Sequence, residues 1–168
     1  MKNLLIAAVF CCTFAQVFAQ QVQIDGRLQP HLNDFFEYCK KYKIPTHDKL
    51  FKLESIDVVN TLTVSEDAST LGMLRRDENN EVVAIDINWV AQLDPEILKV
   101  VAFHEFAHYF LEYDTHVCDD CGHIMSVVNS SYFDIIRNWD AKVKQLFEES
   151  PAFTKAKTPS LTVVYKKE

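Results

Sequence analysis

The chain has 168 residues, of which 48% are hydrophobic, and its formal net charge is −7. The high apolar content, with only three glycines and five prolines, excludes a disordered or low-complexity chain. The acidic balance argues against nucleic acid or an anionic membrane surface as the partner.

The first nineteen residues have the pattern of a secretory signal peptide. Lys2 gives a positive start, residues 4–15 form an apolar run too short to span a bilayer, and Ala19 ends a segment suited to signal peptidase. We therefore expect a signal peptide over residues 1–19 and a secreted or periplasmic protein. The mature chain, residues 20–168, suits a single domain, and no segment of it has the pattern of a membrane span.

The first half of the mature chain predicts one helix followed by strands. Residues 30–42 carry apolar side chains at helical spacing, and residues 53–64 are rich in β-branched residues, as one strand or two. Residues 70–75 and 82–89 read as a hairpin around the turn-prone segment 77–80.

The second half predicts two helices separated by an irregular loop. Asp94, Pro95 and Glu96 form a strong helix start, and this helix is expected to end near residue 111 or 112. Residues 115–130 look irregular, and residues 132–148 predict a last helix. The tail contains a short strand-like run at residues 161–165, which is expected to form an edge strand of the sheet. The alternative is that it pairs with the strand at residues 70–75 and blocks it until the tail is cut.

The pentad His104-Glu105-Phe106-Ala107-His108 carries the chemistry. On a helix the two histidines project from one face and can share one metal ion. Glu105 follows the first histidine, where a carboxylate can act as general base toward water. Because burying these polar groups among phenylalanines is costly without a partner, the pentad predicts one catalytic Zn²⁺.

The pentad and its surroundings resemble the metzincin peptidases, whose long motif is HExxHxxGxxH followed by a turn with methionine. The whole mature chain is similar to a group of small exported bacterial metzincin-like enzymes, with Ile124 and Met125 in the position of that turn. The resemblance implies an α+β zincin fold: a small mixed sheet, an N-terminal helix, an active-site helix, a Met-turn at Met125 and a C-terminal helix.

The third zinc ligand is where the chain departs from that motif. The pattern places its glycine at Leu111 and its third ligand at Asp114. Without the glycine the helix is expected to run on for another turn, and a delayed exit favours His116 as the ligand. Asp114 and His123 remain the alternatives.

The resemblance implies an exported zinc metalloendopeptidase. Glu105 serves as general base in the hydrolysis of a peptide or protein substrate, which lies along the strand at residues 71–74. Tyr109 and Tyr113 are candidates for stabilising the oxyanion. We expect a monomer. The alternative is a catalytically inactive zinc- or partner-binding protein on the same scaffold.

Two features leave further alternatives. Cys118 and Cys121 are expected to form a disulfide, with pairing to Cys39 or a second zinc site as the other options. A gluzincin-like site would take its third ligand from the last helix, where Asp134 and Asp140 are available, but the sequence there does not resemble the gluzincin motif.

Overall fold

A computed structural model describes residues 21–63, 70–127 and 132–157. The predicted signal peptide and the strand-like run at residues 161–165 lie outside the described residues. The strands are β1 (Gln23–Ile24), β2 (Ser55–Val59), β3 (Gly72–Arg76) and β4 (Val82–Asn88). The helices are α1 (Gln29–Lys41), α2 (His47–Leu50), the 3₁₀ helix η1 (Trp89–Leu93), α3 (Pro95–Phe110), α4 (Tyr132–Arg137), α5 (Trp139–Glu148) and α6 (Pro151–Lys157).

The strands form one mixed sheet in the order β1-β2-β4-β3. The first three of these run parallel, and β3 pairs antiparallel with β4. The predicted hairpin, small mixed sheet and α+β class are therefore confirmed. In the segment 53–64, Ser55–Val59 forms a single strand, and β1 was too short to be predicted. Among the described strands β3 lies at an edge of the sheet, and no described strand pairs with its outer side.

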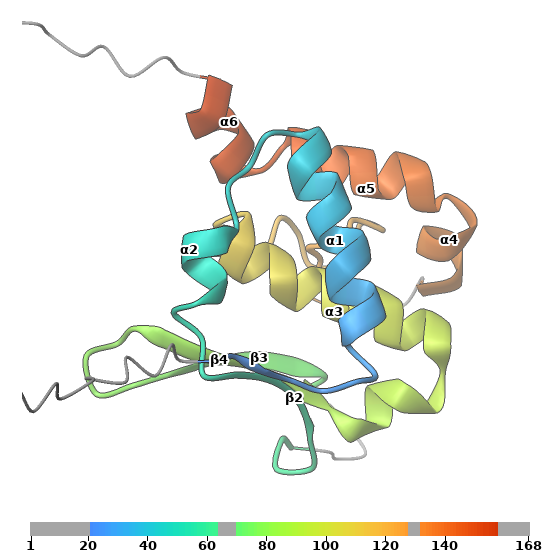
Figure 1. Cartoon of the computed structure of the whole chain (residues 1–168). Coiled ribbons are helices and arrows are strands. Elements are labelled where there is room, and N and C mark those ends of the chain that lie inside the picture. Colours follow the sequence, from blue (N-terminus) through green and yellow to red (C-terminus); the bar gives the residue numbers. More distant parts are fainter. Residues whose placement is uncertain (1–20, 64–69, 128–131, 158–168) are drawn as a thin grey trace, which may run out of the picture.

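The helices α1 and α3 pack together above the sheet (Figure 1). Their contact is built from aromatic rings: Phe35 of α1 lies 5.3 Å from Phe103 and 5.5 Å from Phe106, measured between ring centroids. Phe147 of α5 closes the cluster, 5.2 Å from Phe35. Edge-to-face and tilted ring contacts of this kind stabilise a core beyond the apolar area they bury.

The helix α3 starts as predicted. The Asp94 side chain accepts hydrogen bonds from the backbone N–H groups of Glu96 (2.8 Å) and Ile97 (3.2 Å), and Pro95 occupies the first turn. Apolar residues cover nearly all sides of α3, and most of them are buried, as expected of a helix enclosed by its neighbours. Its rigidity makes it a suitable support for ligands one turn apart.

The helix α3 ends within two residues of the end expected near residue 111 or 112, and the further turn expected from the missing glycine does not form. It ends at Phe110, and Glu112 adopts a left-handed backbone conformation, with φ of 64°. Lys49 of α2 donates hydrogen bonds to the carbonyl groups of Tyr109 and Phe110 and to the Glu112 carboxylate, and Lys155 of α6 also pairs with Glu112. Lys49 thus satisfies carbonyl groups at the helix end, and both lysines hold the Glu112 side chain. A sharp exit therefore forms here without glycine.

The predicted last helix is broken into α4 and α5 at Asn138, whose backbone leaves the helical region (φ −113°, ψ 29°). A further helix, α6, was not predicted, although Ser150-Pro151 is a recognisable helix start: the Ser150 hydroxyl accepts a hydrogen bond from the Phe153 N–H at 3.2 Å. The short helix α2 was also missed. Among the described residues, no helix combines the length and apolar character needed to cross a membrane.

Candidate metal centre

Three histidine side chains converge at the C-terminal half of α3. His104 and His108 lie one turn apart on the helix, and His116 approaches from the loop that follows it. The Nε2 atom of His104 lies 3.1 Å from that of His108 and 3.1 Å from that of His116. Among the described residues these three form the group whose ligand atoms all lie close enough to hold one metal ion.

The hydrogen bonds of two rings determine which nitrogen carries the proton. His104 Nδ1 lies 2.7 Å from the carbonyl oxygen of Ile124, and His108 Nδ1 lies 2.5 Å from that of Tyr113. A carbonyl oxygen only accepts, so each Nδ1 must be the donor, and in the neutral ring each Nε2 then holds a lone pair. This arrangement orients both rings in the way that metal-binding histidines are usually oriented.

The two facing Nε2 atoms cannot be explained by a hydrogen bond between neutral rings, because both are acceptors. Protonation does not resolve this, since burial and the neighbouring histidines lower the pKa of His104 to about 3, and burial lowers the pKa of His108. The three Nε2 atoms are, however, close enough together to act as ligands of one metal ion. Zinc at its usual 2.0–2.1 Å from each nitrogen requires a separation of roughly 3.3 Å between ligands in a tetrahedral site, near the 3.1 Å found here.

Backbone hydrogen bonds join the loop carrying His116 to the predicted Met-turn. Val117 N–H donates to the Met125 carbonyl, and Val127 N–H donates to the Cys118 carbonyl, both at 2.9 Å. Cys118 and Cys121 form a disulfide, and Met125 is fully buried. The same turn therefore supports His104 through the Ile124 carbonyl and His116 through the backbone groups of Val117 and Cys118.

Glu105 lies in an unusual environment for a carboxyl group. Its side chain is 6% exposed, and no hydrogen bond or ion pair to it is found within the described residues. Burial raises the pKa of this carboxyl group to about 8. A strongly shifted acid that lines a cleft beside candidate metal ligands is a typical feature of a catalytic site.

The cleft itself has a volume of about 240 Å³. Residues of the edge strand β3, including Leu74 and Arg76, contribute to its lining. The rest of the lining comes from α3 and the loop that follows it: His104, Glu105, His108, Tyr113, Asp114 and His116. The cleft therefore places three candidate metal ligands, a buried carboxyl group and the edge strand β3 next to one another.

The structure separates the alternative third ligands from the cluster. Asp114 is exposed and lines the cleft without joining the three histidines. His123 is 2% exposed, and its Nδ1 accepts a hydrogen bond from the Met125 N–H at 2.9 Å. Its Nε2 lies 3.6 Å from the Glu149 carboxylate, so His123 supports the turn from inside the core.

The tyrosine and aspartate candidates are also directed elsewhere. The Tyr109 hydroxyl donates to the Lys49 carbonyl and the Tyr113 hydroxyl to the Leu146 carbonyl, both at 2.8 Å. Because each hydroxyl group already donates its proton to a backbone carbonyl, neither tyrosine is positioned to stabilise an oxyanion in the cleft. Asp134 pairs with Arg137 on the surface of α4, and Asp140 is likewise exposed. Neither aspartate belongs to the histidine cluster, so the gluzincin-like alternative gains no support.

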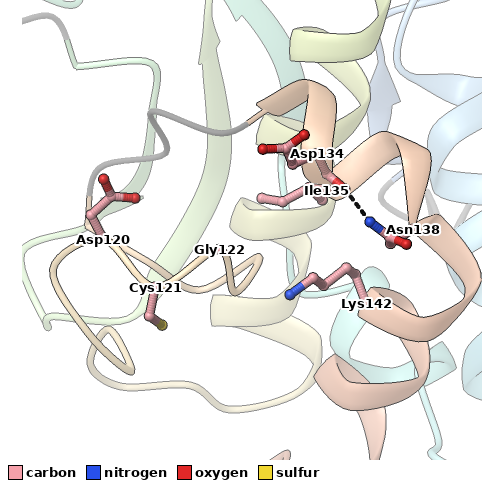
Figure 2. A pocket seen from close by; sticks show the side chains of 7 residues that line it. All are labelled: Asp120, Cys121, Gly122, Asp134, Ile135, Asn138 and Lys142. Carbon is pink, nitrogen blue, oxygen red and sulfur yellow. Dashed lines mark hydrogen bonds between the residues drawn. The ribbon is translucent and has the colours of Figure 1, made fainter.

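A second, larger cavity of about 320 Å³ lies between the disulfide loop and the helices α4 and α5. Figure 2 shows Lys142 reaching toward the loop at Gly122, with Asp120 farther along that loop and Asp134 on α4 beside Ile135. The lining contains no histidine, and the Asn138 side chain is engaged by the Asp134 carbonyl at 3.0 Å. Although this cavity is larger, it contains neither the three histidines nor the buried carboxyl group of Glu105, so the histidine cleft is the better candidate for a reaction centre.

Comparisons of this chain with protein-family models, curated proteins and solved structures found no significant match. The site is therefore interpreted from its own geometry. Sequence reasoning missed the carbonyl groups of Ile124 and Tyr113, since backbone acceptors leave no trace in residue identity. It also missed Gly72, which lies against Glu105.

Proposed function

We propose that the protein is an exported zinc-dependent metalloendopeptidase with a metzincin-like site. The observation that carries the proposal is the pair of acceptor Nε2 atoms of His104 and His108 facing each other at 3.1 Å, with His116 Nε2 equally close to His104. His104, His108 and His116 would hold the ion. When bound, zinc supplies Lewis-acid chemistry: it polarises a carbonyl group and makes water a better nucleophile.

Glu105 is the group that moves the proton. Within the cleft its carboxylate accepts a proton from the attacking water and then delivers it to the leaving amine of the cleaved peptide. Its burial shields the carboxyl group from bulk water, and a cation held by the histidines would favour the charged form that the first step needs. This role distinguishes an enzyme from a protein that only binds zinc, because a pure binding site has no use for a buried carboxyl group.

The edge strand β3 offers a way to hold the substrate. An extended peptide that adds to this edge runs through the cleft beside the histidines, with backbone hydrogen bonds providing affinity independent of sequence. A peptide or protein substrate in extended conformation is therefore the class we propose.

Zinc content and peptide hydrolysis test the proposal together. Purified wild type is expected to bind one equivalent of zinc, and His116→Ala is expected to lose it. Asp114→Ala, which removes an exposed carboxylate from the same loop, is the matched control and should retain the ion. Loss of zinc from Asp114→Ala alone would contradict the proposed ligand set.

The role of Glu105 is tested in the same preparation. Glu105→Ala should retain zinc while its hydrolysis of an unstructured protein substrate falls by about 10²–10⁴-fold, the usual contribution of a general acid–base group. Hydrolysis at the wild-type rate by this variant would remove Glu105 from the mechanism. A wild type that binds zinc but cleaves no member of a broad peptide library would favour the inactive binding protein.

A further inference from the structure

The three glycines of the chain differ in what surrounds them. Gly122 has a positive φ of 64°, a conformation that suits glycine. Gly26 is exposed, with nothing within 4 Å of the position a Cβ atom would take. Gly72 has no positive φ, so its backbone conformation gives no reason for glycine. The reason must come from its neighbours.

The space beside Gly72 is filled by the side chain of Glu105. A Cβ atom at position 72 would lie 2.4 Å from both Cγ and Oε1 of Glu105 and 2.6 Å from Cδ. Real Cβ atoms essentially never come within 3.0 Å of another heavy atom, and ordinary contact begins at 3.4 Å. The missing side chain of the edge strand is therefore what makes room for the carboxyl group.

Close approach to β3 also restrains this carboxyl group. Glu105 is nearly buried, yet within the described part of the chain no hydrogen bond or ion pair orients its oxygens. An unrestrained Glu side chain has several rotamers, and the close approach of the strand limits which of them fit. The carboxylate is thus held by shape between α3 and β3.

We propose that Gly72 is a positioning residue that sets the place of the Glu105 carboxylate in the cleft. The proposal rests on the proposed function, since it assigns Gly72 a part in the same reaction. Alanine at position 72 forces the carboxylate to retreat by about 1 Å, from 2.4 Å to ordinary contact at 3.4 Å. A misplacement of about 1 Å can lower the rate about 10²-fold.

The kinetic test compares Gly72→Ala with the matched control Gly26→Ala in the full-length mature protein. Gly72→Ala is expected to keep its zinc and a KM close to that of wild type while kcat falls about 10²-fold. Gly26→Ala should behave as wild type. A wild-type kcat for Gly72→Ala overturns this inference and leaves the proposed function standing. Absence of zinc-dependent hydrolysis by wild type refutes the proposed function and, with it, a positioning role.

A second readout does not depend on activity. In the metal-free protein, Gly72→Ala should lower the urea midpoint of unfolding in the wild-type background, because it overpacks the space that Glu105 fills. In the Glu105→Ala background the same substitution should lower the midpoint little or raise it, since the obstructing atoms are gone. An equal shift in both backgrounds would mean that Gly72 acts through something other than Glu105, and would overturn the inference.

Discussion

The buried carboxyl group of Glu105 makes the stability of the metal-free protein depend on pH. Its pKa is about 8 in the folded protein and 4.5 at its usual value. Between these values the folded state keeps a proton that the unfolded state has released, so the free energy of unfolding falls as pH rises. Since each pH unit in this window costs about 1.4 kcal/mol, the loss is about 3 kcal/mol at pH 7 and about 5 kcal/mol above pH 8.

The substitution Glu105→Gln isolates this effect. Glutamine has nearly the same shape and no ionisable group, so the difference in unfolding free energy between Glu105→Gln and wild type should be small near pH 4.5 and grow in favour of the variant toward pH 9. The contribution of His104, whose lowered pKa removes stability as pH falls below 6.5, is common to both proteins and cancels in the difference.

Urea unfolding in the presence of a chelator, followed at several pH values, measures this difference. Glu148→Gln, which removes an exposed carboxyl group from α5, is the control and should show little dependence on pH. A difference between Glu105→Gln and wild type that stays constant from about pH 5 to about pH 9 would refute the reasoning. It would mean that Glu105 is not in a water-excluded environment.

Other predictions concern the support of the site and its cysteines. Lys49→Met removes the group that binds the end of α3 and Glu112; it should lower the free energy of unfolding by about 1 kcal/mol in urea titrations, and an unchanged midpoint would count against this capping role. Replacing Cys118 and Cys121 by serine frees the loop after His116 and should weaken zinc affinity about 10–100-fold in chelator competition, whereas wild-type affinity would show that the disulfide does not hold the ligand. Cys39 is buried, and burial raises the pKa of its thiol to about 12, so it should react with a thiol reagent only after unfolding; rapid labelling of the native protein would contradict its burial.

The sequence carried strong local signals for the elements that hold the site. Asp94 and Pro95 specify where α3 begins through a side-chain cap and a fixed φ, and the spacing of His104 and His108 requires one helical turn between them. The hairpin of β3 and β4 could be predicted for the same reason, because alternating apolar residues and turn-forming residues are signals that span only a few positions. Chemistry encoded within one turn or one hairpin needs no knowledge of the rest of the fold.

The tertiary structure decided what depends on distant residues. A sharp end of α3 near Leu111 was not expected from the sequence, because the residues that stabilise it, Lys49 and Lys155, come from helices elsewhere in the chain. His116 joins the other histidines because the loop beyond it pairs with the turn at Met125, a contact between backbone groups. Gly72 and Glu105 are 33 positions apart, and only the packing of β3 against α3 brings them into contact. Non-local packing and backbone hydrogen bonds have no signature in a single sequence, so the details of this site emerge only in the folded chain.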